Sequence, residues 1–133
     1  MVVLRLAKSP EKDKAPVHPE ELNPDRELFM PWGREYQVWH EYWWSPLNPS
    51  RISLDSANLL FGLLQEEDQW AIVPKVVALA AAQRGSYSID YLADPPPNYT
   101  CYKLTHKNST SLTAQALEIF DQYFQTLVCN LQS

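Results

Sequence analysis

The stretch YSIDYLADPPPNYTCYKLTH, residues 87–106, decides how this chain is organised. Two alternating apolar segments, 87–92 and 99–106, flank an Asp-Pro-Pro-Pro connector at 94–97. Each proline fixes φ and lacks an N–H, so the connector can neither continue a helix nor form a central strand. We therefore expect a semi-rigid, extended crossover that carries the chain away from one sheet.

The composition is that of one domain with an acidic balance. The chain has 133 residues, 45% of them hydrophobic, and a formal net charge of −5, which allows a sizeable core. A nucleic-acid surface needs clustered Lys and Arg, which this segment lacks. No apolar run approaches the roughly 20 residues of a membrane span, and 2–6 is too short for a secretory leader. We expect a cytoplasmic protein with no membrane partner.

The chain shows no pattern typical of a metal centre or a catalytic site. His18, His40 and His106 are too far apart in sequence for a metal-ligand motif. No phosphate-binding loop or nucleophile motif is present, so we expect no cofactor and no catalysis. Cys101 and Cys129 are predicted to be buried or half-buried free thiols, with a disulfide as the alternative.

The rest of the chain alternates between predicted strands and predicted helices. Apolar residues with period two predict strands, and apolar residues at helical spacing predict helices. The predicted strands are 2–7, 27–30, 51–54, 70–73, 87–92 and 99–106, and the predicted helices are 34–44, 57–67, 75–83 and 111–131. This alternation indicates an α/β fold with a mostly parallel sheet flanked by helices, followed by an extra C-terminal strand and helix.

Two strand-to-helix turns are the candidate binding regions. Trp32, Gly33 and Arg34 follow one predicted strand, and Asp55 and Ser56 follow the next. In an open α/β sheet, ligands bind at the carboxyl ends of the strands, and the amides of a helix N-terminus attract anions. Plain helix capping by Asp55 and Ser56 is the structural alternative. Arg34 could equally be a surface charge, and Trp32 could simply pack on the sheet.

Aromatic residues crowd the predicted helix at 34–44. Trp39, Tyr42, Trp43 and Trp44 are more than one helix face can bury. Exposed aromatic patches usually mark contacts with a partner. The alternative is a thick local core in which Trp44 covers the end of the helix.

Three segments form a familiar pattern: WAIVP at 70–74, LADPPP at 92–97 and YKLTH at 102–106. They resemble the effector-binding domain of LysR-type transcriptional regulators, which adopts the type 2 periplasmic-binding-protein fold. The resemblance implies two α/β lobes joined by two crossovers, with a small-molecule effector in the cleft between them.

The resemblance also implies a division of the chain. Residues 1–94 would form the second lobe, and residues 95–133 would supply the crossover, strand and C-terminal helix that belong to the first lobe. The DNA-binding helix-turn-helix would be missing, so DNA would be reached only through that absent domain. The strand at 99–106 and the helix at 111–131 would lack their native neighbours, and we expect a homo-oligomer.

By the same resemblance, the effector contacts fall at the turns that follow the strands. The residues implied are Trp32, Gly33, Arg34, Asp55, Ser56 and Pro74. The function implied is the sensing of a small effector, which could be an anion, by a fragment of a transcriptional regulator. Two alternatives stay open: an enzyme or transport lobe of the same fold, and a stand-alone α/β interaction or ligand-binding domain that dimerises.

Overall fold

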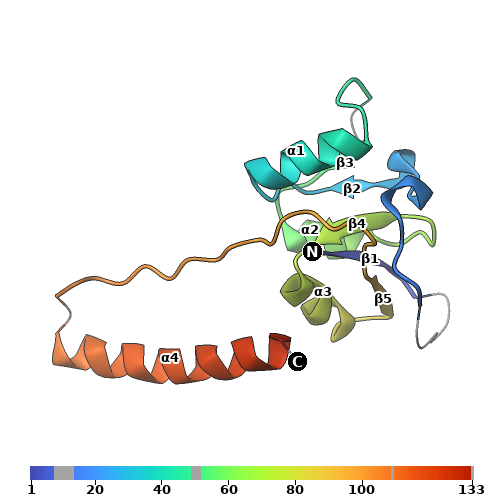
Figure 1. Ribbon diagram of the computed structural model, residues 1–133. Helices are drawn as coiled ribbons and strands as arrows, with labels where there is room; N and C mark the ends of the chain where they lie inside the picture. Colours follow the sequence, from blue (N-terminus) through green and yellow to red (C-terminus); the bar gives the residue numbers. More distant parts are fainter. Residues whose placement is uncertain (8–13, 49–51, 109, 133) are drawn as a thin grey trace. The chain divides into compact units, whose positions relative to one another are not determined.

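The computed structural model describes residues 1–7, 14–48, 52–108 and 110–132. It divides into two compact units, Met1–Tyr99 and Thr100–Ser133 (Figure 1). The first unit is a mixed α/β structure, so the predicted fold class is confirmed at this level.

Helices and strands alternate along the first unit as the apolar periodicity predicts. The elements are β1 (Val2–Leu6), 3-10 helices at Pro19–Glu21 and Pro24–Arg26, β2 (Leu28–Phe29), α1 (Arg34–Trp43), β3 (Ile52–Ser53), α2 (Ala57–Leu63), β4 (Trp70–Val73), α3 (Lys75–Ala82), β5 (Tyr87–Asp90) and, in the second unit, α4 (Ser111–Gln132). No helix in the described part of the chain combines the length and the apolar character needed to cross a membrane.

Helix α2 ends four residues earlier than predicted. Beyond Leu63, the backbone N–H groups of Gln65 and Glu66 both donate to the side-chain Oε1 of Gln69, at 3.0 Å each. The side chain of Gln69 therefore accepts hydrogen bonds from two amides that would donate to backbone carbonyls in a longer helix. This hydrogen bonding ends α2 at Leu63.

Three strands form a sheet in the order β4-β1-β5, and β1 is antiparallel to both neighbours. The expectation of a mostly parallel sheet is wrong for these strands. The reason lies in the connections, because β4 and β5 are the two strands of this sheet that are joined through a single helix, α3. They run parallel to each other with β1 between them, and β1 arrives from outside any strand–helix–strand unit.

The remaining strands are parallel, as predicted. β2 pairs with β3, and a parallel bridge between Glu27 and Trp70 sets the start of β2 beside the start of β4. β3, β2 and β4 therefore run in one direction, and each is followed by a helix. The three strand-to-helix turns consequently lie at the same edge of the strands.

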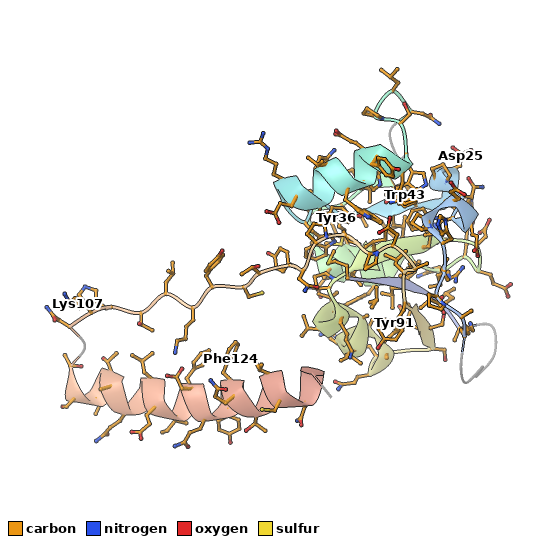
Figure 2. All side chains as sticks on the ribbon, viewed as in Figure 1. Asp25, Tyr36, Trp43, Tyr91, Lys107 and Phe124 are labelled. Atoms are coloured by element: carbon orange, nitrogen blue, oxygen red, sulfur yellow. The ribbon has the colours of Figure 1, made fainter. Side chains whose placement is uncertain are left out.

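Side chains alternate between two core clusters on the two faces of the strands. One cluster joins Val2, Leu4, Ala71 and Val73 to Leu60, Leu64, Ala78 and Ala81 of the α2 and α3 regions. The other joins Val3, Trp70 and Ile72 to Val17, Leu22, Tyr36 and Trp44. Helices thus cover both faces, with α1 on one side of the strands and α3 on the other (Figure 1), and side chains fill the space between α1 and the strands (Figure 2).

The second unit consists of an extended segment and α4. The predicted strand at 99–106 is wrong, because this segment forms no strand in the described structure. Tyr102 and Leu104 are 85% and 93% exposed. An alternating pattern becomes a strand only when a neighbouring strand takes up its hydrogen bonds, and no such neighbour lies among the described residues. The predicted helix is confirmed as α4, and none of its described side chains is buried.

The two cysteines do not form a disulfide. Cys101 and Cys129 both belong to the second unit, and both are exposed. Their predicted burial is wrong for the reason given above: the described side chains of this unit have no core to enter.

Candidate functional site

The structure places three of the predicted site residues at equivalent positions. Gly33, Ser56 and Pro74 are the residues that immediately precede α1, α2 and α3. None of the three helices has a side-chain hydrogen bond at this cap position. Because β2, β3 and β4 are parallel, the three helix starts share one edge of the strands. We call this edge the carboxyl edge.

Trp32 is held against the sheet at the carboxyl edge. Its indole Nε1 donates to the carbonyl oxygen of Ile72 at 2.8 Å, and its half-buried ring packs against both core clusters. The ring of Tyr99 meets it edge-on, with 5.6 Å between ring centroids. Packing on the sheet is therefore observed for Trp32, and Tyr99 is a neighbour that the sequence did not predict.

The other predicted residues differ in their access to solvent. Arg34 and Asp55 are exposed, Ser56 is half-buried and Pro74 is buried. The side chain of Pro74 is thus poorly placed to touch a ligand. Lys75, the first residue of α3, is half-buried beside it and was missed by the sequence analysis, although its place directly after a strand was a usable signal.

Gly33 is the one residue of this edge with an unusual backbone. Its φ is +97°, a conformation that side-chain-bearing residues rarely adopt. A Cβ placed there would have nothing within 4 Å. The glycine is therefore required for the turn into α1 and not for close packing.

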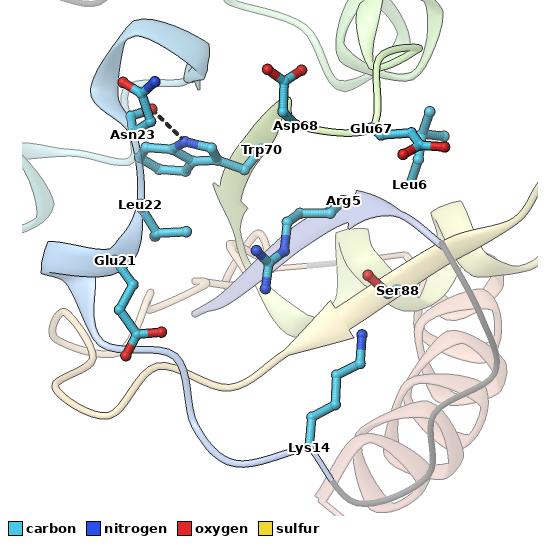
Figure 3. Close-up of a pocket in the computed structure, with 10 residues that line it drawn as sticks. All are labelled: Arg5, Leu6, Lys14, Glu21, Leu22, Asn23, Glu67, Asp68, Trp70 and Ser88. Carbon is cyan, nitrogen blue, oxygen red and sulfur yellow. Dashed lines mark hydrogen bonds between the residues drawn. The ribbon is translucent and has the colours of Figure 1, made fainter.

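A separate hollow lies at the opposite edge (Figure 3). It has a volume of about 430 Å³ and lies beside the start of β4 and the end of β1. Its charged lining residues are Arg5, Lys14, Glu21, Glu67 and Asp68. None of the predicted site residues lines it. Those residues were chosen by the rule that ligands bind at the carboxyl ends of the strands of an open sheet.

A partly buried ion pair joins β1 to β5 beside this hollow. Arg5 donates from Nε and Nη2 to Oδ2 of Asp90, at 2.9 and 2.6 Å. Lys14 Nζ lies 3.8 Å from the other oxygen, and the Asp90 side chain is only 1% exposed. Asp90 therefore balances positive charge that the hollow would otherwise present, which leaves a lining of mixed sign.

A second buried pair joins β2 to α1. Nε2 of His40 lies 2.8 and 2.9 Å from the two carboxylate oxygens of Glu27. The exposed fractions of the two side chains are 10% for His40 and 1% for Glu27. The rings of Phe29 and Trp44 each lie 4.8 Å from the His40 ring, centroid to centroid.

Of the aromatic residues predicted to exceed one helix face, only some enter the core. Trp44 is buried and its ring lies 5.2 Å from that of Trp70, as a thick local core would require. Trp39 and Trp43 are half-buried. Tyr42 is 78% exposed, so it is the member of the group that a partner could still contact.

Tyr36, on the inner face of α1, gives a testable prediction. Its hydroxyl is buried and has no hydrogen-bond partner among the described residues. Replacing Tyr36 by phenylalanine is expected to stabilise the first unit by about 1 kcal/mol at neutral pH, because an unsatisfied buried polar group is removed. The free energy of unfolding in urea, followed by tryptophan fluorescence, would measure the change.

The same variant should respond differently to alkali. Burial, with a smaller contribution from the charge of Glu27, raises the pKa of Tyr36 well above its ordinary value. Below pH ~10 the hydroxyl is therefore neutral in both the folded and the unfolded protein. As the pH rises further, the unfolded state ionises first, and the free energy of unfolding falls. The wild-type protein should lose more stability than Tyr36→Phe between neutral pH and pH ~11. Exposed Tyr42→Phe is the control, and equal losses in all three proteins would contradict the prediction.

No protein-family model and no curated protein matches this chain. The function of the site therefore has to be inferred from its own residues. At the carboxyl edge, Arg34 and Lys75 stand at the starts of α1 and α3, where the helix dipoles also favour negative charge. Asp55 and Glu35 contribute opposing charge at the same edge. The charges of these four side chains balance, so a preference for an anion at this edge would have to come from the helix starts.

Proposed function

We propose that this chain is the effector-sensing part of a LysR-type transcriptional regulator and that its role is binding, not catalysis. The observation that carries the proposal is the convergence of three strand-to-helix turns at one edge, with Gly33, Ser56 and Pro74 at the helix caps. A small anionic effector would be bound by these helix starts together with Arg34 and Lys75.

The path of the chain supports assignment to one lobe of a two-lobed, type 2 periplasmic-binding-protein-like fold. By the resemblance, β1 would be a crossover strand that enters from the other lobe. Its antiparallel pairing with β4 and β5 differs from the predicted parallel sheet but is compatible with such an entry. After β5, the chain continues into the proline connector at 94–97, where Pro96 is buried. Tyr99 then packs on Trp32, so this connector passes along the carboxyl edge.

The mechanism follows from differential binding. An effector that contacts this edge and a facing lobe binds more tightly when the lobes are closed, and it therefore shifts the population toward closure. The DNA-binding part of the regulator would experience that shift as a change in subunit arrangement. By the resemblance, the segment at 100–106 and α4 would belong to the first lobe.

Arg34→Ala is the direct test of the carboxyl edge. Amide chemical shifts would be recorded while succinate, a small dianion, is added to the full chain. We expect shifts at Gly33, Ser56 and Lys75, and an affinity about fivefold to tenfold weaker in the variant, because one charge-assisted hydrogen bond is lost. Lys107→Ala removes the same charge from the second unit and should bind like wild type. Shifts confined to other surfaces, or equal weakening by both variants, would refute the assignment.

A second candidate function, self-association through α4, rests on a different observation. Leu117, Phe120, Phe124 and Leu127 recur at alternating spacings of three and four, which is the pattern of a coiled-coil seam. Phe120, Phe124 and Leu127 are between 41% and 59% exposed. The chain as described therefore carries an apolar helix face that no part of its own unit covers.

Light scattering over a range of concentrations would test this candidate. If α4 mediates association, the wild-type chain forms a dimer or larger species, and Phe124→Lys shifts it to monomer because a charge enters the apolar seam. Gln122→Lys adds the same charge at a polar position of α4 and should leave the assembly intact. A wild-type chain that stays monomeric at every concentration would exclude this function.

A further inference from the structure

A groove beside α1 has no role in the function proposed above. It has a volume of about 290 Å³, at the lower end of the range for small-molecule sites. Phe29 and Trp44 supply aromatic walls, Pro24 lies at the β2 end, and Gln37, His40 and Glu41 line it from α1. His40, half of the buried pair with Glu27, is thus also part of a cavity wall.

The pair with Glu27 fixes the chemistry that His40 offers to the groove. A carboxylate can only accept hydrogen bonds, so Nε2 of His40, which faces both oxygens of Glu27, carries the hydrogen. When the ring is neutral, Nδ1 is then an acceptor. The described residues provide no hydrogen-bond donor for Nδ1, and the ring lines the groove.

The charge around the groove restricts the ligand further. Its described lining includes no Lys or Arg, so no described cation there would compensate the charge of a carboxylate or phosphate. Glu27 lies behind His40, and Glu41 stands at the wall, where it accepts a hydrogen bond from Gln37 Nε2 at 2.7 Å. Both acidic residues disfavour an anion, whereas aromatic walls favour a planar apolar ring.

We propose that this groove binds a small neutral aromatic molecule carrying a hydroxyl group, whose O–H donates to Nδ1 of His40 while its ring packs against Phe29 and Trp44. The site is independent of the carboxyl edge. It is proposed to bind a neutral ligand, whereas the carboxyl edge is proposed to bind an anion. Either proposal can therefore fail without the other.

Fluorine NMR titration of the full chain tests the proposal with three probes. They are para-fluorophenol, fluorobenzene and para-fluorobenzoate, which share a ring and differ in the hydrogen-bonding group. We expect para-fluorophenol to bind about tenfold more tightly than fluorobenzene, as one additional hydrogen bond implies, and more tightly than para-fluorobenzoate. Nuclear Overhauser contacts from bound para-fluorophenol should reach His40 Hε1 and the Trp44 ring.

The matched variants change only the proposed hydrogen bond. Glu27→Leu with His40→Phe removes the hydrogen-bonded pair together and should reduce the preference for para-fluorophenol over fluorobenzene to about one. Val38→Ala, on the exposed side of α1 and 63% exposed, should keep the wild-type preference. A wild-type preference near one, a preference that survives in the double variant, or contacts only to other residues would overturn the proposal. If the double variant does not fold, the wild-type contacts to His40 and Trp44 decide alone.

Discussion

Replacing His40 by alanine is expected to destabilise the first unit by about 3–5 kcal/mol, because it removes the ring that faces both oxygens of a buried carboxylate. The Glu27 side chain is 1% exposed, and both of its oxygens lie within 2.9 Å of His40 Nε2. With the imidazole gone, both oxygens lose the donor that they share. The free energy of unfolding in urea, followed by the fluorescence of the tryptophans, which all lie in the first unit, measures the loss.

A double variant separates the loss of the pair from the exposure of one partner. Glu27→Leu together with His40→Phe removes both polar groups and keeps similar volume, so we expect a change below about 1.5 kcal/mol. Val38→Ala on the same helix should lie within about 0.5 kcal/mol of wild type. If His40→Ala proved as stable as Val38→Ala, the description of Glu27 as a buried charge would be wrong.

Trp70→Ala is the second substitution expected to have a large effect, a loss of about 3–5 kcal/mol. Trp70 is 1% exposed and begins β4. Its ring packs against Trp44, and its Nε1 donates to the carbonyl oxygen of Asn23 at 2.7 Å. The substitution therefore opens a cavity and also leaves that carbonyl without its donor.

Two further variants divide this loss into its parts. Trp70→Phe keeps most of the apolar volume and removes the hydrogen bond, so it should fall between alanine and wild type. Trp43→Ala removes an indole of the same size that is only half-buried and should be milder than Trp70→Ala. Urea unfolding of all three variants gives the comparison, and a Trp43→Ala loss equal to that of Trp70→Ala would contradict the assigned core.

The local sequence pattern was enough to predict β4 and α1. The run Trp70–Val73 is apolar at every position, and the structure buries all four residues because β4 has a core cluster on each face. The helix at 34–44 was predicted from aromatic spacing and a following proline, and α1 matches it to within one residue. In both cases the side chains that decide the element are neighbours in sequence.

Pairing between distant segments could not be predicted in the same way. The residues at 2–7 do not indicate whether this strand is parallel or antiparallel to its neighbours. The direction depends on β4, whose paired residues lie at least 65 positions further along the chain. The pattern at 99–106 is that of a strand, yet the described chain offers it no sheet. Glu27 and His40 are each unremarkable in sequence, and they meet only once β2 and α1 have packed together.

In the candidate site, too, local features were predicted and tertiary contacts were not. Gly33 and Ser56 were predicted correctly as helix starts, because turn chemistry is local. The burial of Pro74 and the contact of Tyr99 with Trp32 depend on tertiary packing and were not foreseen. The hollow beside Arg5 was missed for a similar reason, since the ion pair next to it joins residues from opposite ends of the first unit, Arg5 and Asp90.

The position of β1 has a consequence for how this chain is made. Val3 pairs with Ile72 on one side and with Asp90 on the other. β1 therefore leaves the ribosome before both of its partner strands, and its two edges stay unsatisfied until β4 and then β5 have been translated. During that interval its apolar residues are open to capture by chaperones or by another nascent chain, and high contact order makes the closing step slow.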